Sequence, residues 1–256
     1  MVGAAGGSAM PLLELAGVCK HFGGLQVLRD VTFAVDEGEI VGLIGANGAG
    51  KTTLFNAITG LIPPSAGSIR FRGQEIGGLR PHRICRLGIA RTFQVVRPFA
   101  GASVAQNLQV AAVYGGGAAG LTDGEVAEAV SRLLDFVGLG GKSRAPASSL
   151  SLAELKQLEL ARALATRPRL LLLDETFSGL TPTETRRAMD LIARIRRELR
   201  VTILWVEHVM RAIMRVAERL VVLDHGVKIA EGAPAEIARN PEVVEAYLGA
   251  SRTVRP

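Results

Sequence analysis

The stretch GANGAGKTT, residues 45–53, follows the apolar run IVGLI and combines glycines with one lysine and two threonines. Its glycines, lysine and first threonine fit the pattern G-x-x-x-x-G-K-[ST], in which backbone N–H groups approach phosphate oxygens. In that pattern the lysine meets the β- and γ-phosphates, and the threonine hydroxyl ligates Mg²⁺. A Gly-rich turn that fits by chance is the alternative, but the strand before and the helix after it favour a nucleotide site. The residues that we assign to nucleotide binding are Gly45, Asn47, Gly48, Gly50, Lys51, Thr52 and Thr53.

A pair of carboxylates, Asp174 and Glu175, follows a run of four leucines. A buried strand that ends in a carboxylate can hold Asp174 against Mg²⁺ beside the phosphate loop. Glu175 could then orient or deprotonate an attacking water, a contribution typically worth about 10² to 10⁴ in rate. The alternative is that Glu175 is only a surface residue beyond the strand. Together with the phosphate loop, the pair favours hydrolysis of a nucleotide.

Two further polar residues have weaker signals. His208 follows the apolar run VTILWV, and the carboxyl ends of strands are the edge where such sheets place ligands. It could contact the γ-phosphate and the attacking water, although a lone histidine is usually structural. Gln94, in ARTFQ, would be read in isolation as a solvated loop residue.

Short apolar runs separated by turns predict the strands that must position these residues. Residues 12–44 alternate such runs with turns, and IVGLI is the last of them. AGSIRFRGQEI indicates a strand with a turn. Three later strands are expected at 170–175, 201–208 and 219–224.

Helices are expected between these strands. One should begin at the phosphate loop, cover KTTLFNAIT, and end at Gly60 before Pro63 and Pro64. Apolar residues at helical spacing predict helices over 122–138, where Thr122 or Asp123 could cap the start, and over 152–166. The stretch PTETRRAMDLIARIRREL also has the pattern of a helix.

Strands that alternate with helices predict an α/β fold built on a doubly wound, mainly parallel sheet. The N-terminal strands form a separate β portion, and the helical middle is best interpreted as a lobe inserted into the sheet. We therefore divide the chain into a flexible leader at 1–11, a nucleotide-binding core at 12–91 and 167–232, a helical subdomain at 92–166 and a C-terminal helical tail at 233–256.

The composition narrows the class of protein. With 48% hydrophobic and 21% charged residues the chain is ordinary for a globular protein, and its net charge of +6 suits an acidic partner. The densest basic cluster, Arg194, Arg196, Arg197 and Arg200, fits a solvated helix face better than a groove for nucleic acid.

Cys19 and Cys85 lack metal-ligand or disulfide-framework spacing, so we expect reduced thiols. No run approaches the roughly 18 to 20 apolar residues that span a bilayer. If the chain serves a membrane, we expect it to do so from the cytoplasm, through a partner.

The order of these motifs resembles that of the ATP-binding cassette (ABC) ATPases, whose fold is the P-loop NTPase sheet with an N-terminal antiparallel β portion and an inserted helical subdomain. The resemblance covers residues from about Leu12 to Gly249. Phe22 matches the aromatic residue on which that family stacks adenine, and Gln94 matches its Q-loop glutamine, a further Mg²⁺ ligand. Ser151 matches the signature serine, which reaches ATP bound to a partner, and His208 matches the switch histidine.

The resemblance implies a mechanism and partners. Two cassettes would close head to tail around two ATP molecules with Mg²⁺, using Glu175, His208 and Gln94 as catalytic residues. Closure and hydrolysis would move two transmembrane permease subunits, docked on the helical lobe and on the residues after Gln94. The chain would then lie peripherally on the cytoplasmic face of the plasma membrane, and would bind no nucleic acid.

Three stretches look most like the ATPase subunits of branched-chain amino acid importers: FGGLQVLRDV, GIARTFQVVRPF and the tail EGAPAEIARNPEVVEAYLG. Such importers also use a periplasmic or extracellular substrate-binding protein, and relatives of the subtype serve urea, amides and aromatic acids.

Lipopolysaccharide-export ATPases have a similar C-terminal sequence, so export is the alternative. A soluble cassette ATPase acting on nucleic acid or ribosomes would suit the basic charge, but the chain shows one phosphate loop and no coiled-coil heptads. A P-loop small-molecule kinase would explain Lys51 but not the signature helix.

The chain departs from the family pattern at the signature. Residues 150–154 read LSLAE, so Ala153 replaces the glycine of LSGGQ, and a Cβ there is costly only at positive φ. Thr176 stands where proline is usual, and Thr181 replaces an aspartate. Because these changes fall on parts that complete a partner's site, we hypothesise a heterodimer with one competent and one weakened site. The alternatives are a homodimer with slow hydrolysis and an alanine that is simply accommodated.

Overall fold

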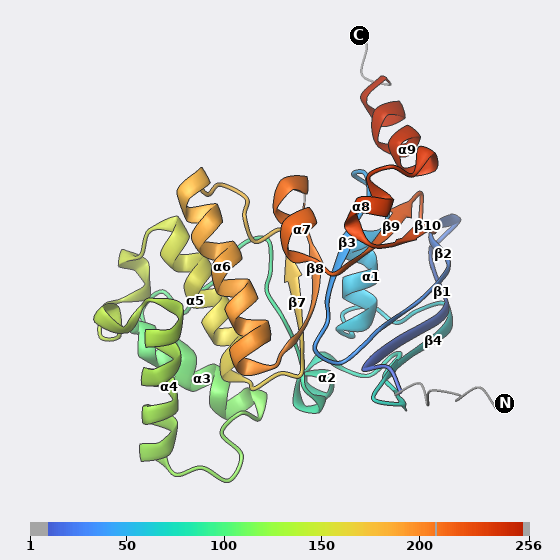
Figure 1. Ribbon diagram of the computed structural model, residues 1–256. Coiled ribbons are helices and arrows are strands. Elements are labelled where there is room, and N and C mark those ends of the chain that lie inside the picture. The colour runs from blue at the N-terminus through green and yellow to red at the C-terminus, as the bar shows by residue number, and fades with distance from the viewer. Residues whose placement is uncertain (1–9, 208, 253–256) are drawn as a thin grey trace, which may run out of the picture.

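Two sheets of different type form the body of the molecule (Figure 1). The computed structural model describes residues 10–207 and 209–252, so most of the predicted leader and His208 lie outside the described residues. The larger sheet has six strands in the order β10-β9-β3-β8-β7-β6, and all neighbours are parallel except β10 and β9. Its strands are β3 (Ile40–Ile44), β6 (Ile89–Arg91), β7 (Leu170–Asp174), β8 (Thr202–Val206), β9 (Arg219–Asp224) and β10 (Val227–Gly232).

The smaller sheet is antiparallel and has the order β2-β1-β4-β5. Its strands are β1 (Leu13–Phe22), β2 (Leu25–Val35), β4 (Ala66–Phe71) and β5 (Gln74–Glu75). Helix α1 (Lys51–Ile58) lies between the two sheets, with its buried side chains in the core that they share (Figure 1). The phosphate loop therefore sits where β3 of the large sheet turns into this central helix.

The remaining helices surround the sheets. They are α2 (Pro81–Leu87), α3 (Val104–Gly115), α4 (Asp123–Val137), α5 (Leu152–Ala165), α6 (Pro182–Leu199), α7 (Met210–Val216), α8 (Pro234–Ile237) and α9 (Pro241–Arg252). Helices α3, α4 and α5 form a lobe on the side of the large sheet that faces away from the antiparallel strands, with α6 beside it (Figure 1). None of the helices in the described part of the chain is long and apolar enough to cross a membrane.

Helices α3, α4, α5 and α6 begin with the same capping device. The first-turn amide is bound by a serine or threonine side chain at the N-cap, and a glutamate or glutamine three residues on binds the N-cap amide in return. In α6 the arginines also find partners, since Arg194 binds Glu198 and Arg196 binds Glu218. This basic cluster is thus a solvated, ion-paired helix face.

Two hydrophobic cores lie on opposite faces of the large sheet. Alternate residues of each strand enter different cores, because successive side chains of a strand point to opposite faces. On β8, Ile203 and Trp205 join the core under the helical lobe, whereas Leu204 and Val206 join the core shared with α1 and the antiparallel sheet. Strand β3 is consequently apolar along its whole length, and β7 and β8 each have one polar residue, at an end of the strand, as expected for a parallel sheet covered on both faces.

The predicted fold class is confirmed by these sheets. The helix expected over 122–138 is α4, with Thr122 rather than Asp123 as its cap, and PTETRRAMDLIARIRREL is α6. The helix after the phosphate loop ends at Ile58, with Thr59 as C-cap and Gly60 following in a left-handed conformation. Helices α2, α3 and α7 and strands β6 and β10 were not predicted.

Candidate functional site

The phosphate loop depends on glycines for steric reasons. A Cβ built on Gly45 would lie 2.2 Å from the carbonyl oxygen of Leu223, so only glycine lets β3 and β9 approach this closely. Gly50 has φ of +100° and caps α1, and a Cβ there would lie 2.8 Å from Leu28 Cδ2. These constraints hold the loop against its neighbours, and its backbone amides precede the N-terminus of α1, where an anion is favoured.

Lys51 is folded over this loop. Its Nζ donates hydrogen bonds to the carbonyl oxygens of Gly45 at 2.7 Å and Ala46 at 2.9 Å. Burial lowers the pKa of Lys51, while the charges of Glu175 and Asp174 act in the opposite direction. The ammonium group is therefore held by carbonyls within the electrostatic reach of both predicted carboxylates.

The two carboxylates leave β7 in different ways. Asp174 is the last residue of the strand and is buried, and its backbone N–H donates to Thr92 Oγ1. Glu175 follows with φ of +48°, an uncommon conformation for a residue with a side chain, and its N–H donates to the carbonyl of Val206. Gln94 Nε2 donates to Glu175 Oε2 at 2.6 Å, so the structure brings these two predicted catalytic residues together.

Sequence reasoning missed Arg91. Its Nη2 donates to Asp174 Oδ2 at 2.6 Å, and its Nη1 donates to Asn56 Oδ1 at 2.6 Å. The guanidinium carbon lies over the rings of Phe55 and Phe93, 5.5 and 5.2 Å from their centroids. The sequence offered only the place of Arg91 shortly before Gln94, because the strand that it ends, β6, was not predicted.

Glu207 was also missed. It is 4% exposed, and its Oε2 has no hydrogen-bond partner among the described residues. Burial raises its pKa to about 7, the backbone amides of Phe177 and Val209 oppose that shift, and the charge of Glu175 adds to it. Glu207 immediately precedes His208, so this carboxyl group belongs to the same sheet edge as Glu175.

Phe22 and Ser151 are placed by the end of a strand and the start of a helix. Phe22 ends β1, is half exposed, and has Lys20 Nζ 5.0 Å from its ring centroid. Ser151 is the exposed N-cap of α5 and, with Ala153, lines a separate cavity of about 320 Å³ between α5 and α6. Ala153 itself is in the helix and is not among the residues with positive φ, so its Cβ causes no backbone strain in this chain.

A groove of about 670 Å³ connects the site to the surface. Thr52, Asp174 and Gln94 line it together with buried and exposed apolar side chains. The most exposed of these apolar side chains are Leu61, Phe93 and Val95. Residues of the predicted metal site and an exposed apolar surface thus share one groove.

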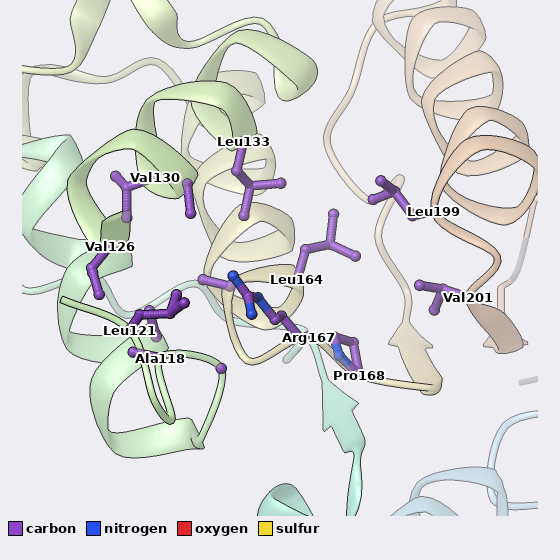
Figure 2. A pocket seen from close by; sticks show the side chains of 14 residues that line it. Ala118, Leu121, Val126, Val130, Leu133, Leu164, Arg167, Pro168, Leu199 and Val201 are labelled. Carbon is purple, nitrogen blue, oxygen red and sulfur yellow. The ribbon is translucent and has the colours of Figure 1, made fainter. Parts of the chain in front are cut away.

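Another cavity, of about 330 Å³, lies under the helical lobe (Figure 2). Its wall is aliphatic, with Leu121, Val126 and Leu164 on one side and Leu199 and Val201 on the other, and Arg167 reaches into it. None of the predicted site residues lines this cavity. It is therefore separate from the phosphate loop.

The donor set at the groove suits Mg²⁺. Thr52 offers a hydroxyl, Asp174 a carboxylate and Gln94 an amide oxygen, and hard oxygen donors completed by phosphates are what this ion prefers. Within residues 10–207 and 209–252 no group of three or more histidine, cysteine or acidic residues could hold a metal ion by itself. The arrangement fits a magnesium ion that arrives with a nucleotide.

Residues 28–178, more than half of the chain, match the family model described as ABC transporter. The chain belongs to the ABC transporter family. It is the cassette of such a transporter, which binds and hydrolyses ATP, and the resemblance inferred from the motifs is confirmed. A second family model, described as branched-chain amino acid ATP-binding cassette transporter, matches residues 227–252.

Relatives of this cassette span almost its whole length. The high-affinity branched-chain amino acid transport ATP-binding protein BraF of Pseudomonas aeruginosa is 40% identical over 93% of this chain and 98% of its own. The corresponding protein LivG of Escherichia coli is 39% identical over 94% and 99%. Among solved structures, the ADP conformation of MJ1267, an ATP-binding cassette of an ABC transporter, has a TM-score of 0.85 and 28% identity, covering 94% of this chain and all (100%) of that one.

Proposed function

We propose that this cassette is the ATP-hydrolysing subunit of an importer of branched-chain amino acids or of related amides, urea or aromatic acids. The observation that carries the substrate class is the match of residues 227–252, which contain β10, α8 and α9, to the branched-chain amino acid model. The names of BraF and LivG point the same way. This tail lies outside the phosphate loop and the carboxylates, so it carries information about subtype that the catalytic residues do not.

At the site, each residue has a proposed role. The phosphate loop residues Gly45, Asn47, Gly48, Gly50, Lys51, Thr52 and Thr53 bind the ATP phosphates, and Phe22 stacks on the adenine. Thr52, Asp174 and Gln94 hold Mg²⁺, which when bound neutralises charge on the phosphates. Glu175 orients the attacking water and accepts its proton, and His208 contacts the γ-phosphate.

The hydrogen bond from Gln94 occupies one carboxylate oxygen of the proposed base, Glu175. While the amide donates to that oxygen, it takes a position that an attacking water would need. Gln94 also belongs to the segment that lines the groove with Phe93 and Val95. Movement of that segment would therefore break this hydrogen bond at the same time as it offers the Gln94 amide oxygen to the metal.

A second cassette and two membrane permease subunits are the proposed partners. Ser151 is exposed at the N-terminus of α5, where it can face ATP bound to the partner cassette. We retain the heterodimer with one weakened site as the proposal for LSLAE, although Ala153 is unstrained in its own helix. The permeases, fed by a substrate-binding protein, would dock at the groove, where Leu61, Phe93 and Val95 are exposed, and would hold the cassette peripherally at the cytoplasmic face of the membrane.

The test is ATP hydrolysis by the purified chain, alone and with a candidate second cassette, for the unaltered protein and for Glu175→Gln. Glutamine keeps the shape of the side chain but cannot act as a base, so Glu175→Gln should lose activity while still binding ATP. Activity only in the presence of the second cassette would support the heterodimer. Brisk hydrolysis by the chain alone would instead show that Ala153 is accommodated.

The substrate is tested separately, in vesicles that contain this cassette together with a candidate pair of permeases. Uptake of leucine driven by ATP, and lost in Glu175→Gln, is the expected result. Uptake of urea or of an aromatic acid in place of leucine would change the substrate within the proposed class. Outward movement of a lipid-linked substrate would refute the importer and support the export-type alternative.

A further inference from the structure

Arg91 forms a buried ion pair with Asp174, a predicted metal ligand. Both side chains are almost fully buried, at 6% and 5% exposure, and Arg91 Nη2 lies 2.6 Å from Asp174 Oδ2. Asn56 accepts a second hydrogen bond, from Nη1, and the third nitrogen of the guanidinium group, Nε, has no partner in the part of the chain that the structure describes. The carboxylate at the end of β7 is therefore already neutralised by a cation from within the chain.

An internal cation at this position changes the energetics of metal binding. A buried carboxylate is costly without a positive partner, and a guanidinium at hydrogen-bond distance supplies one. A Mg²⁺ ion held by the same carboxylate would lie close to the guanidinium in a region of low polarity, where like charges repel strongly. Arg91 and Mg²⁺ therefore compete for Asp174.

Arg91 also touches the groove. Its guanidinium lies against the ring of Phe93, which is half exposed and lines the groove together with Thr52 and Asp174. The Phe93 backbone N–H donates to Glu159 Oε1 at 2.7 Å, so the backbone of this residue is anchored while its ring rests on Arg91. A shift of the guanidinium away from Asp174 would alter the support of this exposed ring.

We propose that Arg91 is a positioning residue that serves as the internal counter-ion of Asp174 before metal binds, and that its exchange for Mg²⁺ is transmitted through Phe93 to the groove. The inference rests on the proposed role of Asp174 as a metal ligand. It adds to that role a function for Arg91, the cation that Mg²⁺ must replace at Asp174. Binding of the metal–nucleotide complex would thereby change the docking surface directly, before hydrolysis.

The first test is a Mg²⁺ titration of the binding of a fluorescent ADP analogue, which requires no hydrolysis. Arg91→Gln removes the competing charge, so the Mg²⁺ concentration for half-saturation should fall by about tenfold or more. Arg162→Gln is the matched control. The Arg162 guanidinium carbon lies 5.0 Å from the ring centroid of Phe99, much as that of Arg91 lies over Phe93. Its Nη1, however, donates to the backbone carbonyl of Arg97 instead of a carboxylate. This control should keep the unaltered Mg²⁺ dependence.

An unchanged or raised half-saturation concentration in Arg91→Gln would overturn the proposal, since Arg91 would then not compete with the metal. Absence of Mg²⁺-dependent nucleotide binding in the unaltered protein would instead refute the proposed function. If Arg91→Gln folds poorly without metal, Arg91→Lys is the second variant. It keeps the charge but cannot bind Asp174 and Asn56 with a planar fork, and its half-saturation should fall by about threefold.

The second test follows the groove. Phe93→Trp adds a half-exposed indole to a chain whose single tryptophan, Trp205, is fully buried, so acrylamide quenching reports mainly on position 93. Addition of Mg²⁺ and ADP should change the quenching, and the change should be lost when Arg91→Gln is combined with it. Quenching that responds equally in both proteins would refute transmission through Arg91.

Discussion

The buried carboxyl group of Glu207 should make the stability of this cassette fall as the pH rises through neutrality. The side chain is 4% exposed and its pKa is raised from 4.5 to about 7. Each unit of difference between the two pKa values corresponds to about 1.4 kcal/mol. Relative to the unfolded state, folding therefore favours the neutral form of Glu207 over the ionised form by about 3 kcal/mol. The perturbation that tests this value is Glu207→Gln, which keeps the shape and removes the ionisation.

The sign follows from proton linkage. Between pH 4.5 and pH 7 the folded state keeps a proton on Glu207 that the unfolded state has released. The stabilising contribution is complete below pH 4.5 and is lost as the pH rises through about 7. The free energy of unfolding of the unaltered protein should therefore decrease by about 3 kcal/mol more than that of Glu207→Gln between pH 4.5 and pH 8.5.

Urea unfolding at several pH values, followed by the fluorescence of Trp205, measures this difference. Trp205 is the only tryptophan and is fully buried in β8, two residues from Glu207, so its emission reports loss of the same core. Comparing the two proteins cancels the titration of groups that both contain. Glu128→Gln, at an exposed site on α4, is the control and should retain the unaltered pH dependence. Parallel stability curves for Glu207→Gln and the unaltered protein would refute the reasoning.

Three further changes test the loop and the helix starts. Gly45→Ala places a Cβ 2.2 Å from the Leu223 carbonyl oxygen, so it should lower the free energy of unfolding in urea by about 2 kcal/mol or more and abolish nucleotide binding. In Gly48→Ala the new Cβ has nothing within 4 Å, so the free energy of unfolding should fall by only about 1 kcal/mol. Thr181→Ala removes the N-cap of α6 and should lower the free energy of unfolding by about 1 kcal/mol, while Thr181→Ser should restore most of that loss. If two copies of this chain pair, Ala153→Gly should raise ATP turnover despite costing about 0.5–1 kcal/mol within the helix, and an unchanged rate would show that the methyl group is accommodated.

Features encoded within a few neighbouring residues could be predicted from the sequence. The spacing of GANGAGKTT located the phosphate loop, and the apolar periodicity located α4, α6 and the central strands. Helices α2 and α7, with seven residues each, are too short for periodicity to be decisive. Strand β10 is partly exposed and its residues VKIAEG do not alternate clearly.

Contacts between distant residues could not be predicted in the same way. Arg91 meets Asp174 because β6 pairs with β7, and nothing near Arg91 in the sequence indicates that pairing. The shifted pKa of Glu207 likewise depends on burial in the folded chain and on the charge of Glu175, which follows a different strand of the sheet. Thr181 illustrates the opposite case, since T-x-x-E directly before a helical pattern indicates a cap from local residues alone.

The division of the interior into two cores has a consequence for how such a protein can diverge. The phosphate loop helix α1 packs in one core, and the helices of the lobe pack in the other, with the large sheet as a partition between them. Substitutions that repack the lobe against a different membrane partner change neighbours on one side of the sheet only. The opposite side, which fixes the phosphate loop, keeps its packing. One ATP-binding core can therefore be combined with many different helical lobes, because the large sheet separates the packing of the two.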